Sequence, residues 1–174
     1  MLRGLSSRIQ QRCPDVVENV NEIVGHLNQS IETARSLARG LLPVRNETGG
    51  LSSALRALAV RSRDVYGLEV TFSAEVCPEF IFTETNASHL YRITQEALTN
   101  AARHGRASLV NIVLIAREDG FSLTITDNGV GFAPVTPSPS GMGLKIMKYR
   151  TDMIGAKFEI AANLPHGAVI TVTG

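Results

Sequence analysis

Apolar residues recur at spacings of three and four between residues 15 and 41, which is the pattern of an amphipathic helix of about seven turns. The stripe consists of Val16, Val20, Ile23, Leu27, Ile31, Ala34, Ala38 and Leu41. Pro14 suits the start of such a helix, whereas Pro43 and Gly49–Gly50 end it. Because an apolar stripe must be covered, we expect it to pack on the chain's own second domain, or in a helical hairpin or dimer bundle in which residues 2–12 end a preceding helix.

The pattern beyond residue 50 alternates between the helical period and the two-residue period of strands. Helices are predicted at 51–67, 86–104 and 142–154, and strands at 68–76, 108–119, 120–129, 156–164 and 167–174. The two central strands are expected to join in a hairpin at Asp119–Gly120. Each element has one apolar face, so we predict an α+β fold, a two-layer sandwich in which a mixed, mostly antiparallel sheet carries helices on one face. The expected domains are 1–45, a helical region, and 51–174.

Composition changes this picture mainly by exclusion. The chain has 174 residues, of which 44% are hydrophobic, and this is enough for one packed domain with an appendage. The net charge of +1 predicts neither a nucleic-acid footprint nor a basic segment for a lipid surface. Cys13 and Cys77 have no metal-ligand spacing, and no apolar stretch is long enough to span a membrane. We therefore expect a reduced cytoplasmic chain without membrane contact, although the parent protein can still be membrane-anchored.

The helix predicted at 86–104 carries four polar residues close together, Glu96, Asn100, Arg103 and His104. Glu96 and Asn100 are four residues apart and share a face, and Arg103 follows three residues later. A surface helix places polar residues toward solvent without further purpose. Carboxylate and amide oxygens at this spacing also suit Mg²⁺ held largely by phosphates and water, and an arginine nearby can neutralise phosphate oxygens. The helix alone leaves both interpretations open.

The stretch DNGVGF follows a predicted strand. Asn128–Gly129 in this position is first of all a hairpin signal, but no return strand follows it. Asp127 with Gly129 and Gly131 also suits the close approach of a flat ligand, whose exocyclic amine would donate to the carboxylate. A segment rich in proline and serine comes next, and residues 133–140 are expected to form a mobile lid.

The stretch GMGLKIM begins the helix predicted at 142–154. Free N–H groups and the positive end of the helix dipole bind phosphate at such a terminus. A Gly-x-Gly before a helix is also a common cap, so the motif is weak by itself. Its position after the proline-rich loop favours a loop that closes over a bound ligand. The residues expected at this ligand are Gly141, Met142, Gly143 and Leu144.

These motifs occur in an order that resembles the GHKL superfamily of ATP-binding domains, named for gyrase, Hsp90, histidine kinases and MutL. QEALTNAARHG resembles its N box, DNGVGF its G1 box and GMGLKIM its G2 box, and the resemblance covers about residues 51–174. Within the superfamily, HLYRITQEALTNAARHG and GLKIMKYRTDMIGAKFEI resemble sensor histidine kinases whose response regulators carry helix-turn-helix output domains. IETARSLARGLLP resembles the second helix of their dimerisation and phosphotransfer hairpin, so 1–45 would be the C-terminal part of that region.

The resemblance implies the GHKL (Bergerat) fold and roles for the candidate residues. Asn100 would bind Mg²⁺, and Asp127 would accept from the adenine amine. Glu96 would polarise the attacking group, and Arg103 would contact phosphate. The other residues expected at the ATP site are His104, Gly129, Gly131, Gly141, Met142, Gly143 and Leu144.

The chain departs from these kinases in its histidines, which are His26, His89, His104 and His166. The kinases' phospho-acceptor is a histidine followed by Asp or Glu, whereas His26 is followed by Leu27. No other histidine here has an acidic neighbour in that position. We therefore expect the acceptor to lie outside this chain, which would bind ATP and Mg²⁺ without labelling itself.

The implied function is that of an ATP-binding catalytic region, which transfers the γ-phosphoryl group to a histidine outside the chain and thence to a response regulator with a helix-turn-helix output domain. The full-length protein is expected to be a homodimer. Two alternatives stay open: a GHKL regulatory serine kinase that acts as an anti-sigma factor, and a nucleotide-free dimerisation scaffold. The long helix at 15–41 disfavours the first, and the polar residues present in all three boxes disfavour the second.

Overall fold

The computed structural model describes residues 50–131 and 142–174. The helix predicted at 15–41, the lid predicted at 133–140 and Gly141 lie outside these ranges. The described elements are α3 (Gly50–Tyr66), β1 (Glu69–Val76), α4 (Glu84–Arg103), β2 (Leu109–Arg117), β3 (Gly120–Asp127), α5 (Met142–Met153), β4 (Lys157–Ala162) and β5 (Ala168–Thr173). Every helix and strand predicted beyond residue 50 is present, and its ends differ from the prediction by at most two residues.

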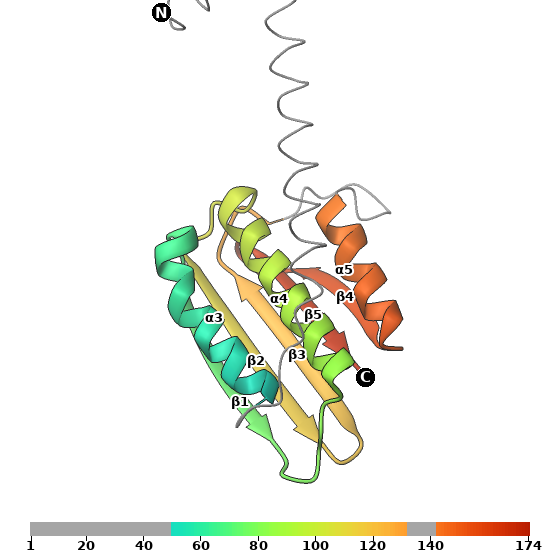
Figure 1. The fold of residues 1–174 in the computed structure, drawn as a ribbon. Helices are drawn as coiled ribbons and strands as arrows, with labels where there is room; N and C mark the ends of the chain where they lie inside the picture. Colours follow the sequence, from blue (N-terminus) through green and yellow to red (C-terminus); the bar gives the residue numbers. More distant parts are fainter. Residues whose placement is uncertain (1–49, 132–141) are drawn as a thin grey trace, which may run out of the picture. The chain divides into compact units, whose positions relative to one another are not determined.

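The five described strands form one sheet in the order β1-β2-β3-β5-β4. Strand β1 runs parallel to β2, whereas the other neighbouring strands pair antiparallel. Helices α3, α4 and α5 lie on the same face of this sheet, as Figure 1 shows. The predicted two-layer architecture is therefore confirmed, including its mixed, mostly antiparallel sheet.

The hydrophobic core lies between the sheet and the helices. Alternate residues of β2 point into it, as the two-residue period requires, and they are Val110, Ile112, Leu114 and Ala116. Helix α4 contributes one buried stripe, which includes Leu90, Ile93, Ala97, Leu98 and Ala101. This helix packs between α3 and α5, so its remaining polar residues face a neighbouring helix or solvent. Within the described ranges, no helix is both long and apolar enough to cross a membrane.

Local signals explain where the first two described helices begin and end. Helix α4 starts at Glu84, two residues before the predicted start, because Thr83 caps it and its side chain accepts a hydrogen bond from the Asn86 N–H at 3.1 Å. Helix α3 ends before Gly67, as predicted. Gly67 has a φ of +69°, and its N–H donates to the Arg63 carbonyl at 3.0 Å.

The hairpin between β2 and β3 corrects the prediction by one residue. Arg117 pairs with Gly120, so the turn consists of Glu118 and Asp119 rather than Asp119 and Gly120. Gly120 instead opens β3 beside the end of β5. A Cβ atom built on it would lie 2.6 Å from the Gly174 carbonyl oxygen. The glycine therefore serves the close approach of two strands and not the tight turn that an Asp-Gly pair predicts.

Candidate functional site

Three of the predicted site residues meet in a seam between α4 and α5. Glu96 and Asn100 lie one turn apart on α4, and both are half-buried. Gly143 in the first turn of α5 lies against them. A Cβ atom built at Gly143 would be 2.3 Å from Glu96 Oε1 and 3.0 Å from Asn100 Nδ2. Only glycine permits this approach, so Gly143 brings the N-terminus of α5 onto the polar residues of α4.

The carboxylate of Glu96 experiences two opposing influences. Burial raises its pKa, while Arg103, Arg150 and His104 lower it. Arg103 and His104 are exposed at the C-terminal end of α4, whereas Arg150 is half-buried on α5. Because burial is the larger influence, the Glu96 carboxylate binds a proton more readily than an exposed glutamate does, which suits a proton acceptor.

A second group of residues surrounds Asp127, the last residue of β3. Its Oδ1 accepts hydrogen bonds from the N–H of Gly129 at 2.8 Å and from the N–H of Ala168 at 3.2 Å. Its carbonyl oxygen accepts from Asn163 Nδ2 at 3.0 Å. No donor within the described residues reaches Oδ2. One carboxylate oxygen is thus fixed by the main chain, and the other can accept a hydrogen bond from a ligand.

The glycines that follow Asp127 are required by the protein's own backbone. A Cβ atom at Gly129 would lie 2.4 Å from the carbonyl oxygen of Gly105, which accepts the Val130 N–H at 2.8 Å. Gly131 has a φ of +73°, and a Cβ atom there would lie 2.7 Å from the Gly167 carbonyl oxygen. These contacts close the loop after β3 against the loop after α4 and the turn before β5. That the two glycines also admit a flat ligand stays a prediction.

The remaining predicted residues take different positions. Arg103 and His104 are exposed, and His104 is the C-cap residue of α4. Met142 is also exposed, while Leu144 is half-buried and packs against the core. The structure therefore assembles two groups, one around Glu96 and one around Asp127, and the loop after α4 touches the second group through Gly105.

Several residues of this region are not singled out by the sequence. Arg150 lies seven residues after Gly143, and the helical period alone would have placed the two on one face. Asn163 and Gly167 support Asp127 from the turn between β4 and β5, and a Cβ atom at Gly167 would lie only 1.9 Å from the Asp127 carbonyl oxygen. Their role depends on the pairing of β3 with β5, which no local pattern reveals.

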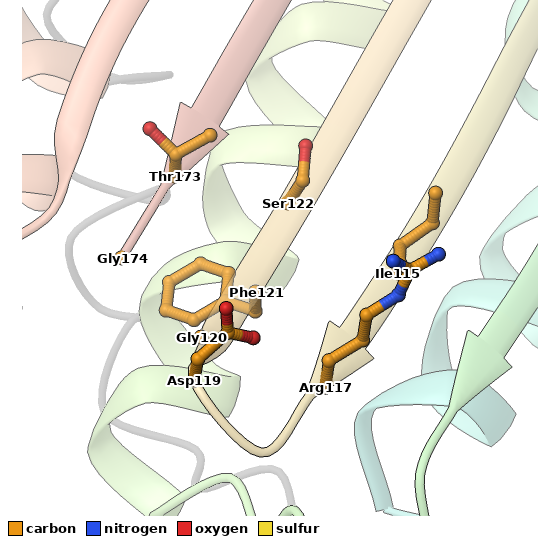
Figure 2. Close-up of a pocket in the computed structure, with 8 residues that line it drawn as sticks. All are labelled: Ile115, Arg117, Asp119, Gly120, Phe121, Ser122, Thr173 and Gly174. Atoms are coloured by element: carbon orange, nitrogen blue, oxygen red, sulfur yellow. The ribbon is translucent and has the colours of Figure 1, made fainter.

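An open hollow of about 570 Å³ lies elsewhere on the sheet. Figure 2 shows its lining residues around the β2–β3 hairpin and the end of β5, and they are Ile115, Arg117, Asp119, Gly120, Phe121, Ser122, Thr173 and Gly174. Gly120 begins β3 and Asp127 ends it. At ~3.4 Å per residue, Gly120 in this hollow is about 24 Å from Asp127, and Ser122 is about 17 Å from it. It includes none of the predicted site residues.

Comparison with known proteins identifies the arrangement. Residues 85–173 match the family described as histidine kinase-, DNA gyrase B- and HSP90-like ATPases. The chain belongs to this ATPase family. This match confirms the resemblance to the GHKL superfamily and the expectation of an ATP-binding domain. Together with the sensor-kinase relatives NreB and LiaS, it also confirms the resemblance to sensor histidine kinases.

Two curated relatives of this ATPase domain are sensor kinases. The oxygen sensor histidine kinase NreB of Staphylococcus carnosus is 26% identical over 166 residues, which cover 95% of this chain and 48% of the relative. The sensor histidine kinase LiaS of Bacillus subtilis is 32% identical over 172 residues, which cover 99% of this chain and 47% of the relative. The chain thus spans about half the length of these relatives.

A solved structure supports the fold assignment. The ATP-binding domain of PrrB from Mycobacterium tuberculosis is 22% identical and gives a TM-score of 0.56, and the match covers 70% of this chain and 90% of that domain. A likeness at this level of identity concerns the fold. It supports the two-layer fold described above.

Proposed function

We propose that this ATPase domain is the catalytic region of a sensor histidine kinase, which transfers the γ-phosphoryl group of ATP to a histidine outside this chain. The observation that carries the proposal is the seam in which Gly143 lies against Glu96 and Asn100, because it joins a helix N-terminus to oxygen ligands and a proton acceptor. The names of the relatives NreB and LiaS, both sensor histidine kinases, support it further.

The side chains and free N–H groups of these two regions suit the adenine and the phosphates of ATP. Asp127 offers an unoccupied acceptor, Oδ2, to an exocyclic amine such as that of adenine, and its other oxygen is already fixed by two N–H groups. The free N–H groups in the first turn of α5, beside Gly143 and Leu144, suit phosphate oxygens. Arg103 at the end of α4 adds positive charge on the same side of that helix as Glu96, whose pKa it lowers. His104, the next residue, is exposed and its ring can donate a hydrogen bond to phosphate.

Asn100 also fits a role in holding Mg²⁺. Its side-chain oxygen is half-buried in the seam beside the glycine end of α5. The described residues contain no group of three or more His, Cys, Asp or Glu side chains that could hold a metal ion. An ion at Asn100 would therefore take most of its ligands from phosphate and water, as Mg²⁺ does. When bound, it would neutralise charge on the phosphates.

Glu96 would polarise the attacking imidazole, and the chain's own histidines are not suited to be attacked. His89, His104 and His166 are followed by Leu90, Gly105 and Gly167, none of which can orient or deprotonate the ring. His89 is half-buried on α4, and His26 lies outside the described residues. We propose that the acceptor lies on a helical hairpin of which 1–45 is the C-terminal part, in a cytoplasmic homodimer that phosphorylates a response regulator with a helix-turn-helix output domain.

The test is a phosphotransfer assay with a separate acceptor. The chain is incubated with γ-labelled ATP, Mg²⁺ and a helical-hairpin domain that carries a histidine followed by Asp or Glu. We expect acid-labile label on that histidine, no label on this chain, and loss of transfer in the Asn100→Ala variant. Acid-stable label on serine would favour the regulatory serine kinase, and failure to bind nucleotide by calorimetry would favour the scaffold. Stoichiometric label on His26 would overturn the proposal that the acceptor lies outside the chain.

A further inference from the structure

Helix α3 has an exposed outer side that the proposed function does not use. Figure 1 shows α3 at the edge of the helix layer, where it packs beside α4 and over β1. Its buried residues face the core, and they are Leu51, Leu55, Leu58, Ala59 and Ser62. On the opposite side Val60 is 74% exposed, which is unusual for an aliphatic residue in the middle of a helix that is otherwise well packed.

The outer side of α3 has the pattern of a coiled-coil seam. Four exposed residues at spacings of four, three and four form one stripe along it, and they are Ser53, Ala57, Val60 and Asp64. Exposed arginines flank this stripe, with Arg56 and Arg63 on one side and Arg61 on the other. In a coiled coil these flanking positions carry the charges that choose the partner helix. An open hollow of about 390 Å³ follows the stripe between Arg56 and Arg61.

The three arginines are not neutralised within the described part of the chain. No ion pair there includes Arg56, Arg61 or Arg63. The Arg56 guanidinium lies 5.4 Å from the centre of the Phe72 ring on β1, and this contact restrains it beside the hollow. Asp64 is the single acidic residue in the sequence of α3, so the helix has a net charge of +2, whereas the whole chain has +1.

These charges and side chains discriminate among the possible occupants of the surface. A second copy would place arginine opposite arginine, because flanking positions meet flanking positions in a helix pair. A lipid surface is bound by large apolar side chains between the cations, but the centre of this stripe offers Val60 between Ala57 and Asp64. A nucleic acid is bound by a broader basic footprint than a helix with a net charge of +2 provides. An acidic helix satisfies both the arginines and the stripe.

We propose that the outer side of α3 is a docking surface for an acidic amphipathic helix of a partner protein. Small and aliphatic side chains of that helix pack along Ser53, Ala57 and Val60, and flanking Glu or Asp residues pair with the arginines. At ~1.5 Å per residue α3 is about 25 Å long, so a single helix pair gives a small interface and a weak, reversible complex. The surface shares no residue with the candidate ATP site, and the inference therefore does not depend on the proposed function.

The test measures the binding of two synthetic helical peptides to the chain by fluorescence anisotropy. Both peptides have Ala and Leu at heptad positions a and d, and they differ only at e and g, where one has Glu and the other has Lys. We expect the Glu peptide to bind with a Kd on the order of 10 μM, and the Lys peptide to bind at least about tenfold more weakly. Added salt should weaken the Glu peptide, because the ion pairs are exposed. ATP should not change either affinity.

Charge reversal provides a readout that general damage to the fold does not imitate. Arg61→Glu with Arg63→Glu should weaken the Glu peptide by roughly tenfold or more and strengthen the Lys peptide. The matched control is Arg117→Glu with Lys157→Glu, which makes the same change in net charge at exposed residues of the sheet. It should alter neither affinity by more than about threefold. Val60→Ser should weaken both peptides without lowering the melting temperature, since Val60 is exposed.

Several outcomes would overturn the proposal. They include a failure of the Glu peptide to bind, equal affinities for the two peptides, and an equal loss of binding in the matched control. Self-association of the chain in sedimentation experiments that Val60→Glu abolishes would identify a second copy as the occupant. Binding to phosphatidylserine vesicles or to duplex DNA that is lost in Arg61→Glu with Arg63→Glu, without binding of the Glu peptide, would assign the surface to a lipid or a nucleic acid.

Discussion

The end of β3 and the seam between α4 and α5 hold their carboxylates in different ways. Asp127 is fixed by main-chain N–H groups, and glycines pack the surrounding loops at backbone contact. Within the described residues Glu96 receives no hydrogen bond, and it is influenced instead by burial and by the charges of Arg103, Arg150 and His104. The main-chain N–H groups fix the position of the Asp127 carboxylate, whereas burial and nearby charges shift the pKa of Glu96. The first suits recognition of an unreactive ring, and the second suits proton chemistry.

The largest effect is expected where the main chain packs most tightly around Asp127. In Gly167→Ala the new Cβ atom would lie 1.9 Å from the Asp127 carbonyl oxygen, at a φ of +107°. We expect a loss of about 3 kcal/mol or more in the free energy of unfolding, from overpacking and the positive φ together. Gly155→Ala is the matched control, since its φ is +66° but no atom lies within 4 Å. It should cost roughly 1–2 kcal/mol. If denaturant titrations gave the same loss in free energy of unfolding for both variants, the backbone around Asp127 would be able to move away from the new Cβ atom at little cost.

The next effect concerns binding rather than stability. Asp127→Asn keeps an oxygen for the N–H groups of Gly129 and Ala168 but places an NH₂ group where Oδ2 stood. We expect ATP affinity to fall roughly ten- to hundredfold, because a hydrogen bond to a charged group is lost, while the melting temperature changes little. Asp119→Asn, an exposed change at the opposite end of β3, should leave affinity unaltered. If calorimetry gave equal ATP affinities for Asp127→Asn and the parent, the assignment of Asp127 to the adenine amine would be wrong.

The sequence predicts the two regions unequally well. The helices, strands and motifs follow from local periods and turn residues, and so does the face shared by Glu96 and Asn100. The partners of Asp127 do not, because Asn163, Gly167 and Ala168 reach it only through the pairing of β3 with β5. The interaction of Arg150 with Glu96 likewise requires α5 to pack along α4. Local patterns therefore reveal which residues carry chemistry, while tertiary pairing decides what holds them.

A smaller effect is expected at Asn128, which we predict to support the fold, whereas Asp127 beside it is predicted to bind ATP. Asn128 Oδ1 accepts from the N–H groups of Ser108 and Leu109, each at 3.0 Å, and Nδ2 donates to Ser108 Oγ at 3.0 Å. Asn128→Ala should lower the free energy of unfolding by about 1–2 kcal/mol, since the site is exposed, and change ATP affinity by less than about threefold. Asn128→Asp keeps the acceptor and should be intermediate. If Asn128→Ala instead weakened ATP binding at unchanged stability, Asn128 would be a ligand contact.

The smallest predicted effect is a gain in stability rather than a loss, and it concerns Glu96 in the seam between α4 and α5. Burial raises the pKa of Glu96 above its ordinary value, so the folded protein binds the proton more tightly than the unfolded chain does. The ionised carboxylate therefore costs stability at every pH above its folded pKa, and this cost disappears as the pH falls below the unfolded pKa. Glu96→Gln carries no such cost. We expect it to melt at a higher temperature than the parent at pH 7 and to lose phosphotransfer, with the difference in melting temperature vanishing toward low pH.

Glu118→Gln, an exposed change in the β2–β3 turn, should show no such pH-dependent difference. A lower melting temperature for Glu96→Gln at pH 7 would mean that Arg150 and Arg103 stabilise the carboxylate by more than its burial costs, and that the seam is a stabilising ion pair rather than a strained functional site.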